Sequence, residues 1–137
     1  MKQGNRSTCP ISTALELVGD RWTLLVIRDL MFAGKRHFRE FLHSEEAISS
    51  NVLTDRLNTL VQSGIVTKSD DPSHVQRSIY SLTEKGLDLL PVLVAMSAWS
   101  QKHYPGTQRP EAVQLVQGGT KRLKKLEGLL RQQHGIS

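Results

Sequence analysis

The sequence lacks long apolar runs and contains very little cysteine. Among its 137 residues Cys9 is the one cysteine, which excludes an internal disulfide and a metal cluster built from thiolates. No run of 18 apolar residues is present, so no transmembrane helix is expected. The segment from Met1 to Thr8 is polar and lacks the apolar stretch of a signal peptide. We therefore expect a cytoplasmic protein of a reducing compartment, with no membrane partner.

The sequence also lacks the patterns of an enzyme or a metalloprotein. Its histidines lie far apart and show no metal-ligand spacing: His37, His43, His74, His103 and His134. No Ser-His-Asp or Cys-His pair stands out, and there is no glycine-rich phosphate loop. We expect no catalytic activity, no metal site and no cofactor.

The net charge of +5 is concentrated at the C-terminal end. Residues 118–137 hold five basic residues and one acid, whereas residues 1–117 hold 13 basic and 12 acidic residues. The main body is therefore nearly balanced, and its function has to follow from where its charges lie. The basic residues of the tail are Lys121, Arg122, Lys124, Lys125 and Arg131.

Apolar periodicity predicts four helices in the first half of the chain, over residues 10–18, 21–32, 37–42 and 49–63. Glycines at 19, 34 and 64 supply the stops, and Asp20 and Ser49 are suitable N-caps. The helix over 21–32 is apolar on nearly every side, which places it at the centre of the core.

The pattern then changes to a hairpin followed by further helices. Strands are predicted over 65–68 and 78–82, joined by a turn-rich tip. A long helix is predicted from Thr83 to His103, bent at Pro91. Residues 104–110 are rich in breakers and predict a linker, and an amphipathic helix is predicted over 120–133.

The short helix, turn and polar-faced helix have the order of a helix-turn-helix, and the hairpin that follows has the position of a wing. A helix enters the major groove of DNA only if its exposed face is polar and uncrowded. The candidate face carries side chains that can bond to base edges or, at the helix start, to a phosphate: Ser49, Ser50, Asn51, Thr54, Asp55 and Asn58.

Basic residues around this helix are candidates for contacts with the DNA backbone: Arg36, Arg39 and Arg77. Arg56 either grips a phosphate or pairs with an acid such as Asp29 or Glu40. His74 at the hairpin tip either contacts DNA or is simply solvated. On periodicity alone the alternative holds equally well, namely a solvated polar helix and an ordinary edge hairpin.

The residues themselves resemble the HxlR-type winged helix-turn-helix transcriptional regulators, which are related to the MarR group. The matching stretches are Cys9-Pro10-Ile11, LVGDRWTLL (17–25), IRDL (27–30), RHFREF (36–41), ISSNVLTDRL (48–57), YSLTEKG (80–86) and Trp99. The position of Asn51 is often basic in the family, so we expect a different base preference here. The resemblance says nothing about the chain beyond Pro105.

This resemblance implies a mainly α fold with a small β-hairpin wing and additional dimerisation helices. It implies a homodimer that binds double-stranded DNA at a pseudo-palindromic operator, with the first helix and the long C-terminal helix in the dimer interface. We expect a winged-helix domain over 9–104, then a linker and basic helix over 105–137. The alternative is a winged-helix module for protein interaction without operator binding.

Three regulatory features remain open at this stage. Cys9 at the start of the first helix is a candidate redox sensor, because a helix N-terminus favours negative charge; Arg6 or Lys2 would add to this. A small apolar effector is a second hypothesis, with a pocket lined by Met31, Phe32, Met96 and Trp99. The basic tail either docks on its own protomer, adds non-specific DNA affinity or reinforces the dimer.

Overall fold

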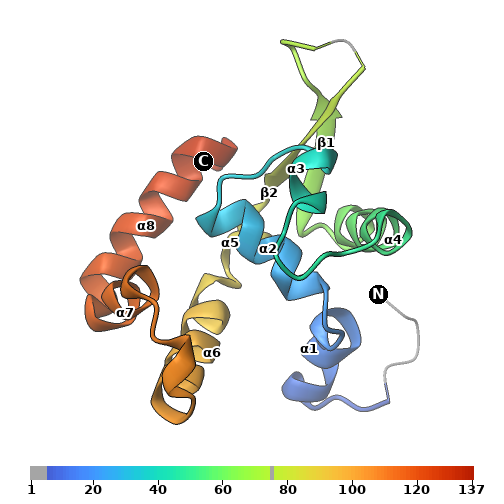
Figure 1. The fold of residues 1–137 in the computed structure, drawn as a ribbon. Helices are drawn as coiled ribbons and strands as arrows, with labels where there is room; N and C mark the ends of the chain where they lie inside the picture. Colours follow the sequence, from blue (N-terminus) through green and yellow to red (C-terminus); the bar gives the residue numbers. More distant parts are fainter. Residues whose placement is uncertain (1–5, 75) are drawn as a thin grey trace. The chain divides into compact units, whose positions relative to one another are not determined.

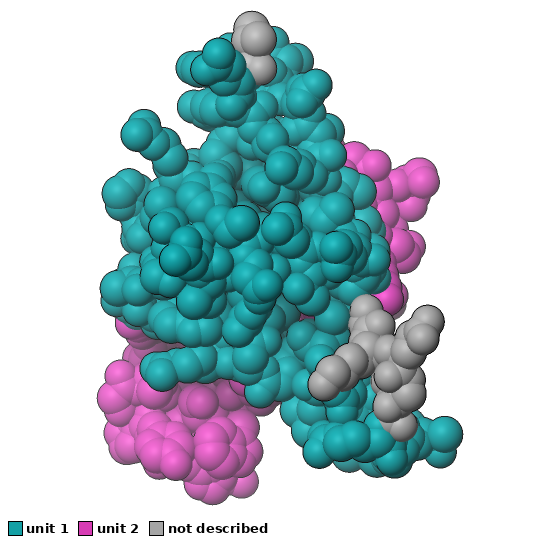
Figure 2. Space-filling view, turned by 90° about the vertical axis from the view of Figure 1, so that its right-hand side faces the viewer, with its two compact units in different colours: residues 1–83 teal, residues 84–137 magenta. Residues whose placement is uncertain are grey.

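The computed structural model describes residues 6–74 and 76–137, so Lys2 and the first part of the polar N-terminal segment lie outside the described residues. The chain divides into two compact units, residues 1–83 and 84–137 (Figure 2). Each unit has its own order of elements. No helix within the described ranges is long and apolar enough to cross a membrane.

The first unit contains four helices and then an antiparallel hairpin (Figure 1). The prediction for the first helix and for the helix beginning after Ser49 is confirmed, with the glycine stops in place. Gly34 and Gly64 have φ values of +65° and +76°, which a side chain would disfavour. The elements are α1 (Pro10–Val18), α2 (Thr23–Phe32), α3 (Phe38–Leu42), α4 (Ser50–Gln62), β1 (Val66–Asp70) and β2 (Ser78–Leu82).

Helix α2 lies in the core of this unit, as its apolar composition predicts. Ile27 and Leu30 are fully buried, and each of the other elements except α1 contributes buried side chains. These include Phe41 from α3, Leu53, Leu57 and Leu60 from α4, and Val66, Tyr80 and Leu82 from the hairpin. The core therefore fixes α3, α4 and the wing within one unit.

The predicted start of α2 at Arg21 is wrong by two residues. The carboxylate of Asp20 accepts bonds from the backbone N–H groups of Trp22 and Thr23, at 2.7 and 2.9 Å, and from the Thr23 hydroxyl. This turn occupies the positions where the helix was expected to begin. Partial burial acts to raise the pKa of Asp20, but these bonds and Arg56 outweigh it and lower the pKa to about 2.

The second unit contains helices and one 3-10 turn, and the predicted single bent helix is wrong. The chain forms α5 (Glu84–Leu87) and then α6 (Leu90–His103), with Pro91 in the first turn of α6. Proline lacks the N–H that a continuing helix needs and its ring clashes with the preceding turn, so the helix is interrupted and restarts. The remaining elements are η1 (Pro105–Thr107), α7 (Pro110–Gln117) and α8 (Gly119–His134).

Helix α7 was not predicted, and α8 begins one residue before the predicted start. Gly118 lies between α7 and α8, and Gly119, the first residue of α8, has a φ of +60°. The C-terminal half of α8 is anchored in its own unit, because Arg131 Nη2 lies 2.5 Å from Glu84 Oε2 on α5. Leu130 and His134 are buried on the same helix.

Candidate nucleic-acid interface

Helix α4 has one buried face and one exposed polar face. Ser49 caps it, because its Oγ accepts a bond from the N–H of Val52 at 3.2 Å. The apolar face is fully buried through Leu53, Leu57 and Leu60. The structure brings together on the opposite side, exposed to solvent, the predicted residues Ser50, Asn51, Thr54, Asp55 and Asn58. This face is free to meet a groove, because the packing of α4 uses the other one.

The turn between α3 and α4 is held from both sides. Ala47 has a φ of +59°, in the left-handed region that favours glycine. Glu46 next to it forms a double contact with Arg28 of α2, at 2.7 and 2.9 Å, and this pair raises the pKa of Arg28. Ile48 on the other side is buried. The direction in which α4 leaves the turn is therefore determined by contacts with α2 and the core.

The hairpin projects from the helices of this unit as a wing would (Figure 1). Its strands pair in a register that sets Val66 opposite Leu82 and Asp70 opposite Ser78. The β1 side chains from Thr67 to Asp70 are exposed.

The carboxylate of Asp71 links the base of the hairpin tip to the start of α3. Its carboxylate accepts bonds from the hydroxyl and N–H of Ser73, at 2.7 and 2.9 Å, and lies 2.9 Å from His37 Nε2. These bonds lower the pKa of Asp71 to about 2. Its bonds therefore stabilise the fold above an ordinary carboxyl pKa, and the contribution disappears as the pH falls towards 2. Sequence reasoning missed this pair, because no local pattern links positions 34 residues apart.

Arg36 is bonded to the wing. Its Nε donates to the carbonyl of Tyr80 at 2.6 Å, its guanidinium also bonds Ser81, and its own carbonyl accepts from the Tyr80 N–H at 2.8 Å. Burial lowers the pKa of Arg36, although Glu40 opposes the shift. Arg36 thus connects the start of α3 to β2, and a DNA contact by this residue stays a prediction.

Arg56 pairs with Asp20, not with either acid that the sequence suggested. Its Nε lies 3.0 Å from Asp20, and it also pairs with Asp55 beside it. Asp29 is instead engaged by Arg28 at 2.9 Å, by Lys35 and by Ser44.

Glu40, the other suggested partner of Arg56, accepts from the N–H groups of Arg36 and His37 at 3.0 and 2.9 Å. The bond from the Arg36 N–H is the main reason why its pKa is lowered. The carboxylates of Asp29 and Glu40 therefore stabilise the segments before and after α3, and neither is the partner of Arg56 on α4.

Three further predicted residues lie at the surface of this unit. Arg39 on α3 is exposed and has no ion pair with any residue in the described part of the chain. Arg77, directly before β2, is half-exposed, with its Nη2 3.5 Å from Asp71. His74 at the tip is exposed, and its N–H donates to the Asp71 carbonyl. Arg39 and Arg77 are therefore the most accessible of the predicted cations here.

Cys9 is the N-cap of α1, as predicted, and it is exposed. Its side chain makes no capping bond. Arg6 lies 2.8 Å from Glu16, so its charge is compensated within the same segment. Of the suggested effector-pocket residues, Met31 is buried in the first unit, Phe32 is exposed, and Met96 and Trp99 are exposed on the second unit. That pocket stays a hypothesis.

Comparisons with known proteins match this geometry to a family. The model for the HxlR-like helix-turn-helix matches residues 17–108. The chain is 37% identical over 100 residues to an HTH-type transcriptional regulator of Mycobacterium tuberculosis, Rv3095, and the match covers 73% of this chain and 62% of that protein. It is 37% identical over 99 residues to the HTH-type transcriptional regulator YodB of Bacillus subtilis, covering 72% of this chain and 88% of YodB.

Solved structures agree in fold. The reduced form of YodB superposes with a TM-score of 0.58 at 34% identity, over 72% of this chain and 96% of that chain. PA1607, a putative transcription factor, superposes with a TM-score of 0.67 at 34% identity, over 73% of this chain and 68% of that chain. Residues beyond 108 lie outside the family match. The chain therefore belongs to the HxlR family of winged helix-turn-helix transcriptional regulators.

Proposed function

We propose that this protein binds DNA in a sequence-specific manner, as a homodimer on a pseudo-palindromic operator, and so regulates transcription. The observation that carries the proposal is the exposed polar face of α4, opposite the side that packs into the core. Such a helix can lie in the major groove, where Asn pairs with adenine and Ser or Thr meets several base edges. In this assignment α4 is the recognition helix.

Backbone contacts come from the residues around the recognition helix. Arg39 on α3 and Arg77 on the wing are accessible cations, and His74 lies at the wing tip. Contacts to phosphate fix the register of a protein on DNA but carry no sequence information. Arg36 and Arg56 supply charge nearby while they hold the unit together.

The deciding experiment is selection of bound duplexes from a random pool, followed by footprinting of the enriched sequence. A regulator of this kind enriches two inverted half-sites whose centres are separated by about one helical turn of DNA or slightly more. Failure to enrich any sequence would favour the interaction-module alternative.

Asn51→Ala and Thr54→Ala are each expected to weaken binding to the selected operator by about 1–3 kcal/mol and to relax the preference at one base position. The reason is that each substitution removes a base contact without altering the buried face of α4. Titration of the operator and of single-base variants measures both effects. Gln62→Ala, at the exposed C-terminal end of α4, is the matched control and leaves affinity unchanged. Equal losses on every sequence would contradict the base-reading role.

Arg77→Ala is expected to weaken binding to all duplexes and to reduce the slope of log affinity against log salt by about one, because the substitution removes one cation that neutralises a phosphate. Affinity measured at several salt concentrations gives the slope. Gln76→Ala, next to it on the hairpin, is the control. An unchanged salt slope for Arg77→Ala would mean that the wing is not part of the DNA interface.

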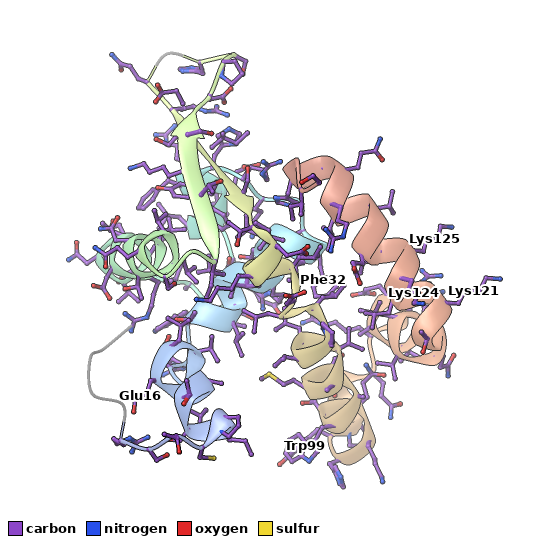
Figure 3. The ribbon with its side chains drawn as sticks, turned by 180° about the vertical axis from the view of Figure 1, so that it is seen from behind. Glu16, Phe32, Trp99, Lys121, Lys124 and Lys125 are labelled. Atoms are coloured by element: carbon purple, nitrogen blue, oxygen red, sulfur yellow. The ribbon has the colours of Figure 1, made fainter. Side chains whose placement is uncertain are left out.

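The proposal of a homodimer is based on exposed apolar side chains on two helices. On α1, Ile11 and Leu15 are 72% and 52% exposed. On α6, Val92, Met96 and Trp99 are 42%, 50% and 59% exposed, and Figure 3 labels Trp99 on this helix. Large exposed apolar side chains are typical of surfaces that bind a partner. We assign that partner as a second copy of this chain.

Regulation by an oxidant or electrophile at Cys9 is supported by two observations. The thiol is exposed at the N-cap of α1. Structures of the related protein YodB have been solved in reduced, quinone-bound and diamide-treated forms. With one cysteine in the chain, oxidation leads to an intersubunit disulfide or a mixed disulfide with a small thiol, whereas a quinone adds to the thiolate to form a thioether.

Treatment with diamide or a quinone is expected to lower the operator affinity of the wild-type protein and to leave Cys9→Ser unaffected. The modified thiol lies at the N-cap of α1, a helix assigned to the dimer interface, so modification is expected to alter the spacing of the two recognition helices. Operator binding before and after treatment measures this. Added reductant reverses a disulfide formed with diamide, whereas the thioether formed with a quinone is not reversed by it. An equal response in Cys9→Ser would exclude the thiol as the sensor.

A further inference from the structure

Helix α8 carries a group of exposed basic side chains that the proposed function does not use. Lys121, Arg122, Lys124 and Lys125 are all exposed, and none has an ion pair with any residue that the structure describes. Lys121, Lys124 and Lys125 lie on the side of α8 that faces away from α6 (Figure 3). We call these four residues the α8 patch.

The rest of α8 shows that the patch is not simply a solvated surface of balanced charge. Arg131, on the C-terminal half, is neutralised by Glu84 at 2.5 Å and by Glu127 at 3.5 Å. Leu130 and His134 anchor that half by burial. The one acid of residues 118–137 is Glu127, which follows the patch and pairs with Arg131, so the four basic residues outnumber the nearby carboxylates. Its positive charge is left for an external partner.

We propose that the α8 patch binds the phosphate backbone of the DNA duplex and adds sequence-independent affinity to the protein. This inference rests on the proposed function, which brings a duplex to the protein. The spacing is suitable: residues 121 to 125 rise about 6 Å along a helix, close to the roughly 6.8 Å that two phosphate steps of one strand cover along the duplex axis. Lysine acts as a point charge towards phosphate, so the patch needs no fixed geometry.

A negatively charged membrane is the main alternative partner, and the apolar side of α8 argues against it. A helix that lies on a membrane inserts an exposed apolar face between the lipids. On α8 the side opposite Lys121 carries Leu123 and Leu126, which are half-buried, and Leu130, which is 1% exposed. Most of the face that would have to enter the membrane is thus already packed against protein, and Leu129 beside it is 47% exposed.

The test measures affinity of the full-length protein for a random-sequence duplex between about 50 and 200 mM salt, because each phosphate contact contributes about 0.9 to the slope of log affinity against log salt. The triple variant Lys121→Gln, Lys124→Gln, Lys125→Gln is expected to flatten the slope by about 2.7 for each protomer, and each single variant by about 0.9. Lys102→Gln, an exposed lysine on α6, is the matched control and leaves the slope unchanged.

The outcome is separable from that of the proposed function. Preference for operator over random duplex is measured in parallel; the α8 variants keep this ratio, whereas Asn51→Ala lowers it. A wild-type slope in the triple variant overturns the patch assignment even if operator preference persists. If the triple variant loses binding to phosphatidylserine-containing vesicles but keeps the wild-type salt slope for DNA, the patch assignment is also overturned and the patch is assigned to a membrane. If the triple variant is poorly folded by circular dichroism, the single variants decide.

Discussion

Trp99→Ala is expected to dissociate the proposed homodimer and to lower operator affinity with it. Trp99 is 59% exposed on α6 and contacts the rings of His103 and Tyr104, with centroids 5.5 and 5.6 Å away. An exposed tryptophan within an aromatic group is the kind of residue that dominates an interface, and its truncation typically costs at least about 2 kcal/mol, which is about 30-fold in the dissociation constant. The effect is large because the interface of a twofold dimer contains the residue twice.

Sedimentation equilibrium measures the dimer dissociation constant, and titration of the operator measures the consequence for DNA. Leu129→Ala is the matched control, because Leu129 is 47% exposed but lies on α8, outside the assigned interface. Since Trp99 is not buried, the variant keeps its thermal stability when measured at a concentration where both proteins are monomeric. A dimer dissociation constant equal to that of the wild type would mean that α6 is not part of the dimer interface.

Phe41→Ala is expected to destabilise the protein by about 3–5 kcal/mol. Phe41 is 1% exposed and packs edge-on against Tyr80 of β2, with ring centroids 6.2 Å apart. Helix α3 has only five residues, too few to be stable without tertiary contacts, so it depends on this side chain. The loss is a large fraction of the stability of an ordinary domain.

Urea unfolding followed by circular dichroism measures this change. Phe38→Ala on the same helix removes an equally large side chain from a half-buried position, so it is expected to cost clearly less. Similar losses in the two variants would mean that burial of Phe41 does not determine the stability of α3.

Local signals in the sequence account for much of the fold. The stops at Gly34 and Gly64 and the cap at Ser49 each act within one turn of chain, and the predicted ends of α1 and α4 follow from such signals. The exposed face of α4 was predictable for the same reason, because the spacing of Leu53, Leu57 and Leu60 determines what lies opposite. Pro91 was recognised as a perturbation, but whether a proline bends a helix or restarts it depends on what packs around it.

The contacts that position the candidate interface were not predictable in the same way. Arg56 meets Asp20, 36 residues earlier, and His37 meets Asp71, 34 residues later. Many acids were available to each, and only the packing of the helices selects one. Helix α7 was missed because the breaker-rich segment before it suggested a linker, although Pro110 at its first turn is a usual start for a helix.

The strained turn at Ala47 has a consequence for divergence among relatives. The direction of α4 depends on a residue held at positive φ, on a glutamate bonded to α2 and on a buried isoleucine, none of them on the exposed face of α4. Substitutions in this turn are expected to change the direction of α4 while every side chain on its exposed face stays the same. With α4 as the proposed recognition helix, two relatives with identical residues on that face need not bind the same DNA sequence, because the turn as well as the helix then determines operator preference.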